Sequence, residues 1–115
     1  MKRGLLRDWT LAIAKVHREH KCRRCGCTGK LDAAHTIGRE YDRAADGTRN
    51  GVLVVNPDDV VPLCVACHTA YDAHQVDLLP FLTQAEQARA VLHVGLMSAL
   101  ARLTGTRDWT QTQAA

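Results

Sequence analysis

Two cysteine pairs constrain this 115-residue chain more than any other feature of its sequence. Cys22-x2-Cys25 and Cys64-x2-Cys67 both have the spacing of a zinc knuckle, and 38 residues separate the inner cysteines. Four thiolates brought together in this way form a closed tetrahedral shell, which suits zinc because zinc accepts soft ligands and needs no redox partner. The spacing therefore predicts a structural Zn²⁺ site, with a folded segment between the two pairs.

A fifth cysteine, Cys27, follows the first pair. It could replace Cys25 as a ligand, although the Cys-x2-Cys-Gly form of residues 22–26 favours Cys25. Buried thiols, a redox-active pair or an iron site are the alternatives to zinc. A closed shell leaves no open coordination position, so we expect this site to stabilise the fold and not to catalyse.

The length of the chain allows one domain, residues 1–115, whose modest core a bound metal would help to stabilise. The charged first residues do not resemble a signal peptide, and no apolar run is long enough to span a membrane. We therefore expect a cytoplasmic protein with no membrane contact. In a reducing compartment, cysteines are more often metal ligands or free thiols than disulfides.

Basic side chains are concentrated at the N-terminal end of the chain. Residues 1–24 carry eight basic and two acidic side chains, and the remaining residues carry seven basic and ten acidic ones. Residues 1–21 are expected to form a basic N-terminal helical region, in which apolar residues at helical spacing predict a helix over residues 5–18: Leu5, Trp9, Ala12, Ile13 and Val16. Its opposite face would carry Arg3, Arg7, Lys15 and Arg18. This basic face suggests a polyanion partner, and a solvated helix face explains it equally well.

The rest of the chain has the signals of a small α+β fold. Residues 30–36, 52–55 and 60–63 are β-prone, and the last two segments flank a turn at residues 56–58. A helix is expected over residues 65–77. Thr83 and Glu86 form a capping-box signature for a helix over residues 83–105, which Gly105 would end. Residues 106–115 are expected to be a flexible tail.

Histidines and carboxylates lie close to the cysteines in the sequence. His35 ends the first predicted strand, and His68 directly follows the second cysteine pair. Asp72 would share a helix face with His68, and Asp59 precedes the last predicted strand. A zinc site that ties strand to helix would bring these side chains near one another. Taken singly, each of them is also explained as an ion-pair partner or as a packing residue.

Three segments in this order resemble the four-cysteine branch of the HNH endonuclease family of phages and bacteria: residues 22–26, residues 31–39 (LDAAHTIGR) and residues 56–68 (NPDDVVPLCVACH). The resemblance covers residues 22–78. It implies a zinc-stapled ββα-metal core of treble-clef type, flanked here by an N-terminal and a C-terminal helix. It also implies an enzyme of a bacterium or a phage-infected host that hydrolyses DNA.

The resemblance assigns roles by position. His35 matches the general base, His68 matches the last histidine of the motif, which is a metal ligand, and Asp72 matches a second helix ligand. Asp59 stands where the middle asparagine usually stands, and as a catalytic residue it would hold the divalent metal with His68, in place of or beside Asp72. The residue before the base often binds metal, and here it is Ala34, which cannot. The departures at Ala34 and Asp59 bear on the catalytic metal shell more than on the fold.

The chemistry expected from this resemblance is metal-dependent phosphodiester hydrolysis. A neutral histidine can accept a proton from water near pH 7. A divalent cation would relieve charge on the phosphate, and a mixed shell would take Mg²⁺ or Mn²⁺, or a softer ion such as Ni²⁺ or Zn²⁺. DNA contact is expected through phosphates, with these candidate residues: Arg39, Arg23, Arg24, Arg7 and Arg18.

Two other functions fit the same sequence. One is a non-catalytic treble-clef zinc module that binds DNA or a protein partner. The other is a degenerate nuclease that lost its ligand at Ala34 and became a binding protein. A homodimer or a partner in phage genome packaging would fit the nuclease, since a single active site nicks DNA and two in a dimer cut both strands.

Overall fold

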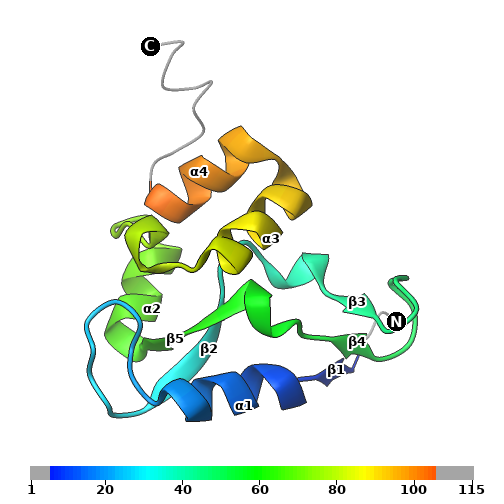
Figure 1. Cartoon of the computed structure of the whole chain (residues 1–115), viewed down its shortest axis with the longest axis horizontal. Helices are drawn as coiled ribbons and strands as arrows, with labels where there is room; N and C mark the ends of the chain where they lie inside the picture. Colours follow the sequence, from blue (N-terminus) through cyan, green and yellow to red (C-terminus); the bar gives the residue numbers. More distant parts are fainter. Residues whose placement is uncertain (1–5, 106–115) are drawn as a thin grey trace.

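An antiparallel pair of strands, β2 (Leu31–His35) and β5 (Val60–Cys64), forms the centre of the fold (Figure 1). The structure is a computed structural model that describes residues 6–105. Leu31 pairs with Cys64 and His35 pairs with Val60, so the cysteine end and the histidine end of the pair lie apart. These strands confirm the predicted segments 30–36 and 60–63.

The two faces of the β2–β5 pair contact different helices, because successive side chains of a strand point to opposite faces. On one face, Ala34, Val61 and Leu63 pack in the larger core with α2 (Val65–Asp72), including its buried Tyr71. On the other face, Val60 packs in a smaller core with α1 (Thr10–Glu19). The described part of the chain is thus a small α+β domain with four α-helices.

A second, three-stranded sheet lies beside the central pair (Figure 1). β1 (Arg7–Asp8) runs parallel to β4 (Leu53–Val54), and β3 (Arg43–Ala44) pairs with β4 on its other side. The 3₁₀ turns η1 (Arg39–Tyr41) and η2 (Pro57–Asp59) flank this sheet. The predicted helix over residues 5–18 is therefore wrong at its start, because Arg7 and Asp8 pair with β4 and the helix begins at Thr10.

The buried face of α1 also differs from the predicted one. Lys15 is only 5% exposed, whereas Ile13 is 47% exposed. The Lys15 ammonium donates to the backbone oxygens of Pro57 and Val60 and to the Glu86 carboxylate. These three acceptors match its three N–H donors, which is why a charged side chain can stand on the inner face.

The predicted C-terminal helix is divided into α3 (Gln84–Val94) and α4 (Leu96–Thr104). Gly95 separates them with a φ of 84°, a left-handed conformation that residues with a Cβ rarely adopt. The capping box of Thr83 and Glu86 and the C-cap at Gly105 are both confirmed. The expected tail at residues 106–115 lies outside the described residues, as does Leu5.

The segment between α2 and α3 closes the larger core. α2 ends at Asp72, earlier than the expected limit of residue 77, and η3 (Leu79–Phe81) follows. Leu78 is fully buried, and its backbone N–H donates to the Leu103 oxygen of α4 at 2.8 Å. Within residues 6–105, no helix combines the length and the apolar character needed to cross a bilayer.

Candidate metal centre and histidine sites

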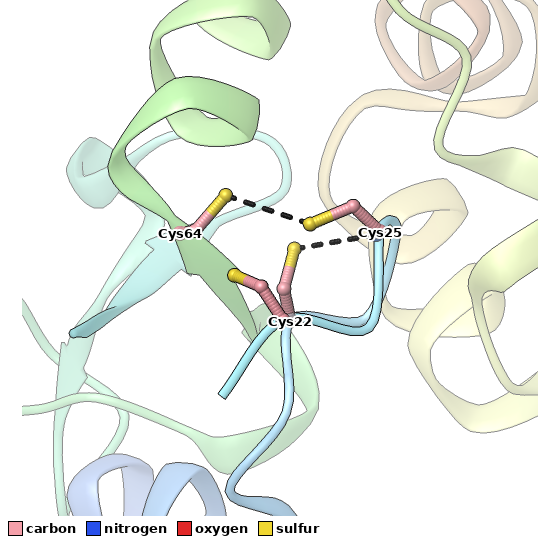
Figure 2. Close-up of side chains that lie close together, drawn as sticks. Cys22, Cys25 and Cys64 are labelled. Atoms are coloured by element: carbon pink, nitrogen blue, oxygen red, sulfur yellow. Dashed lines mark hydrogen bonds between the residues drawn. The ribbon is translucent and has the colours of Figure 1, made fainter. Parts of the chain in front are cut away.

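Four thiols gather where the knuckle of residues 22–27 meets the junction of β5 and α2. The sulfurs of Cys22, Cys25, Cys27 and Cys64 all lie within 4.8 Å of one another. Figure 2 shows Cys22, Cys25 and Cys64 turned toward one another, with 3.7 Å between the sulfurs of Cys25 and Cys64. A tetrahedral zinc with Zn–S bonds of about 2.3 Å separates its sulfurs by about 3.8 Å, so the cluster is compatible with a structural metal site.

Backbone hydrogen bonds shape the knuckle before any metal is considered. The N–H of Cys22 donates to the oxygen of Cys27 at 2.8 Å, and the N–H of Gly26 donates to the oxygen of Cys22 at 2.9 Å. Gly26 has a φ of 79°, the left-handed conformation that closes this turn. The N–H of Arg23 donates to the Pro62 oxygen of β5, which fixes the knuckle against the central pair.

The four-thiol group and the ligand set predicted from sequence share Cys22, Cys25 and Cys64 and differ in the fourth thiol. The sequence assigned Cys67 as the fourth ligand, whereas the four-thiol group contains Cys27. Cys67 is 5% exposed, and the Arg24 guanidinium donates to its sulfur at 3.6 Å. Burial raises the pKa of the Cys67 thiol to about 12, although Arg24 opposes this. Burial also acts to raise the pKa of Cys22, but hydrogen bonds from backbone N–H groups outweigh it and lower that pKa to about 6.

His35 is held at the far end of β2 by a buried carboxylate that the sequence analysis missed. Its Nε2 lies 3.1 Å and 3.2 Å from the two oxygens of Asp42. The Asp42 side chain is 1% exposed, and it also accepts a hydrogen bond from Nε of Arg7 at 3.0 Å. The edge of the Trp9 ring packs against the imidazole, with ring centroids 5.5 Å apart. In the neutral histidine, an N–H at Nε2 leaves Nδ1 as the proton acceptor.

His68 lies between two carboxylates. Its Nδ1 is 2.9 Å from Asp32, and its Nε2 is 3.4 Å from Asp72. The structure therefore brings His68 and Asp72 together as predicted, and adds Asp32, which no sequence pattern singled out. Asp32 and Ala34 alternate with His35 along β2 and so face α2, where Ala34 is fully buried.

The Asp59 carboxylate is directed toward α3. Nε and Nη2 of Arg89 donate to its two oxygens at 3.0 Å and 2.9 Å, and Nε2 of His93 lies 3.0 Å from one of them. Burial acts to raise the pKa of Asp59, but hydrogen bonds from Arg89 and His93 outweigh it and lower the pKa. In this structure the carboxylate joins η2 to α3 and does not contact His68.

The predicted catalytic residues thus belong to three separate groups. His35 and Asp32 are three positions apart on one strand, so they point to opposite faces and are separated by about 10 Å along it. Consequently His35 does not meet the pair formed by His68 and Asp72. Within residues 6–105, the cysteine group is the only set of three or more potential metal ligands whose donor atoms lie this close together.

Of the five arginines predicted to bind phosphates, two form contacts within the protein and three are exposed. Arg23 pairs with Glu19 and with the buried Glu86. Arg7 is engaged by Asp42 and by the backbone oxygen of Arg39. The surface residues are Arg18, Arg24 and Arg39, of which Arg24 also contacts Cys67.

Comparisons with protein-family models, with curated proteins and with solved structures give no match for this chain. Any functional assignment therefore rests on the residues and contacts described above.

Proposed function

We propose that this chain is a metal-dependent endonuclease of the HNH kind, which hydrolyses phosphodiester bonds of DNA with His35 as the general base. The observation that carries the proposal is the hydrogen bond between Nε2 of His35 and the buried carboxylate of Asp42. The order of the cysteine, histidine and carboxylate motifs along the chain supports the same conclusion.

The contacts of His35 suit proton abstraction. An N–H at Nε2 directed at Asp42 fixes the tautomer in which Nδ1 carries the lone pair. No partner for Nδ1 is found among residues 6–105, so that atom is free to accept a proton from water. The Asp42 carboxylate would then stabilise the imidazolium that forms, as carboxylates do behind catalytic histidines. Arg7 also donates to this carboxylate, at Oδ2.

A catalytic divalent ion would be held by His68 together with one of its two neighbouring carboxylates, Asp32 or Asp72, because these contact opposite nitrogens of the imidazole. An imidazole and one carboxylate, completed by water, form a donor set that takes Mg²⁺, Mn²⁺, Ni²⁺ or Zn²⁺. Such an ion would neutralise charge on the phosphate and stabilise the leaving oxygen. The cysteine cluster would hold a structural Zn²⁺ and keep α2 against the knuckle.

One observation favours a second candidate, the non-catalytic zinc module that binds DNA. His35 and His68 lie on opposite faces of the β2–β5 pair, and Ala34 supplies no metal ligand between them. If the protein is such a module, the hydrogen bond with Asp42 would have only a structural role, which is to orient His35 for packing against Trp9. Both candidate functions predict that the protein binds DNA, so DNA binding by itself does not distinguish them.

Plasmid cleavage separates the two candidates. Zinc-loaded protein, purified in parallel with His35→Ala and His17→Ala, is incubated with supercoiled DNA and added Mg²⁺, Mn²⁺ or Ni²⁺. His17 is an exposed histidine of α1 and serves as the matched control. We expect wild type and His17→Ala to nick or linearise the plasmid and His35→Ala to lose this activity while it keeps its zinc and its circular dichroism. DNA binding without cleavage by all three proteins would replace the nuclease with the binding module.

A further inference from the structure

A cleft of about 380 Å³ lies between α3 and the loop that carries η1 and β3. Its walls include aromatic rings, hydrogen-bond donors and one carboxylate, and the residues that matter for its chemistry are Tyr41, Arg43, Asn56, Asp59, Arg89 and His93. None of the functions considered so far uses this cleft.

The cleft has one carboxylate, and its hydrogen-bonding capacity is largely used. Asp59 is the sole acidic residue among those that line it, and it accepts two N–H groups of Arg89 and contacts Nε2 of His93. The bidentate pair holds the Arg89 guanidinium in one orientation. The carboxylate therefore acts as an anchor for the donors and is poorly placed to receive a cationic ligand.

Several donors in the same walls remain without a partner among residues 6–105. Nη1 of Arg89 has none, and Arg43 uses only Nη1, which donates to the backbone oxygens of Glu40 and Asp42. The Oδ1 atom of Asn56 accepts the N–H of Asp58 at 2.8 Å, which leaves the side-chain NH₂ available. Two guanidinium groups and one carboxylate give these walls a net positive charge. An excess of donors with cationic character is the chemistry that recognises phosphate oxygens.

Some residues that line the cleft are next in sequence to the partner of the candidate base. Tyr41 and Arg43 are the sequence neighbours of Asp42, which holds His35. On the opposite wall, the backbone oxygen of Asp59 accepts the N–H of Thr36, the residue that follows His35. Tyr41 and His93 have ring centroids 5.2 Å apart and offer an aromatic surface to a sugar or a base. A strand seated in the cleft would therefore run close to His35.

We propose that this cleft binds a backbone phosphate of the DNA strand, next to the phosphate that is cut. The inference rests on the proposed function, in that the strand is taken to be the substrate. Arg43 and Arg89 would contact the phosphate oxygens, Asn56 would donate a further hydrogen bond, and Tyr41 would lie against the neighbouring sugar.

The first test measures the affinity of the full chain, loaded with zinc, for a short duplex without added catalytic metal. Arg43→Gln removes a cation from the cleft, and Lys30→Gln removes an exposed cation outside it. We expect Arg43→Gln to weaken binding about five- to tenfold, because one charge-assisted contact is lost, and to reduce the slope of log K against log salt by about one. Lys30→Gln should change the affinity less than about twofold. Equal effects of the two substitutions would overturn the proposal.

A second test does not depend on cleavage. Inorganic phosphate is titrated into the protein while the imidazole C–H signals of His93 and the side-chain NH₂ signals of Asn56 are followed by NMR. We expect both to shift in wild type and in Lys30→Gln, and to stay unchanged in Arg43→Gln. Shifts with phosphate combined with unchanged duplex affinity in Arg43→Gln would mean that the cleft takes free phosphate, which overturns the assignment to DNA.

The two proposals fail in different ways. Phosphate-dependent shifts and a weaker duplex affinity in Arg43→Gln, with no plasmid cleavage by any ion, would retain the cleft and remove the nuclease. Cleavage that requires His35, with normal duplex affinity in Arg43→Gln, would retain the nuclease and remove the cleft.

Discussion

Lys15 of α1 and Glu86 of α3 form a buried ion pair, with 2.5 Å between Nζ and Oε2 and with side chains 6% and 1% exposed. Arg23 of the knuckle donates to both oxygens of the same carboxylate, and the N–H of Thr83 donates to one of them. One carboxylate therefore links α1, the knuckle and the start of α3. A buried charge is stable only when its partners satisfy it, so the network should respond strongly to the loss of any member.

Replacing Glu86 by Leu should destabilise the fold. The substitution leaves the buried Lys15 ammonium without its anion, leaves the half-buried Arg23 guanidinium with Glu19 alone, and removes the Glu86 side-chain half of the capping box of α3. We expect a loss of about 3–5 kcal/mol in the free energy of unfolding, measured by urea denaturation of the zinc-loaded protein. Glu40→Leu, at an exposed position, is the control. A loss below about 1 kcal/mol would show that the network contributes little.

The contribution of Glu86 should depend on pH. Burial acts to raise its pKa, but hydrogen bonds from Arg23, Lys15 and Thr83 outweigh burial and lower the pKa to about 2. A carboxyl whose pKa is lower in the folded state stabilises the protein above its unfolded pKa of about 4.3, and this stabilisation is lost as the pH falls toward the folded pKa.

The measurement compares wild type with Glu86→Gln, so that acid effects on the thiolates cancel in the difference. The stability difference should be nearly constant above about pH 5 and should shrink by roughly 2–3 kcal/mol between pH 5 and pH 2. If the stability difference were independent of pH over this range, the pKa of Glu86 would be the same in the folded and the unfolded protein.

Removal of one shared thiol should release the metal. Cys22, Cys25 and Cys64 belong both to the set predicted from sequence and to the four-thiol group of the structure. Cys64→Ser should therefore weaken zinc binding by at least about 100-fold in competition with a chelator, and thermal unfolding should move to lower temperature, because the metal stabilises the folded state. Thr28→Ser, on the exposed loop after the knuckle, is the control.

Parallel measurements on Cys27→Ser and Cys67→Ser identify the fourth ligand. If one of these two variants still binds zinc tightly, the cysteine replaced in that variant is not a zinc ligand. If Cys64→Ser itself retained stoichiometric zinc, the cluster would not be the metal site.

Asp42 should matter for cleavage beyond its contribution to stability. Asp42→Asn keeps the shape of the side chain but removes the anion behind His35, and its amide can favour the wrong tautomer of the imidazole. We expect single-turnover cleavage of plasmid DNA to slow by about 10²–10⁴-fold, with little change in DNA affinity. Arg7→Gln weakens the support of Asp42 but retains the carboxylate, so it should slow cleavage less. Equal rates in wild type and Asp42→Asn would remove Asp42 from the proposed chemistry.

Local sequence patterns determined several elements of this protein directly. The knuckle at Cys22 and Cys25, the β-prone runs that form β2 and β5, and the capping box of Thr83 and Glu86 each depend on residues within one turn or one strand. Such patterns are readable because helices repeat every 3.6 residues and strands every two.

Only the tertiary structure decided which distant side chains meet. Asp42 and Arg7 are 35 positions apart, and Lys15 and Glu86 are 71 positions apart, yet each pair forms a buried or half-buried ion pair. Helical periodicity predicted that Lys15 faces solvent. In the structure Lys15 is on the buried face, because two backbone oxygens and the Glu86 carboxylate accept its hydrogen bonds there. The grouping of Cys27 with the other thiols and the engagement of Asp59 by Arg89 have the same origin. The energy of a buried polar group depends on its partners across the fold, and sequence spacing alone carries no record of them.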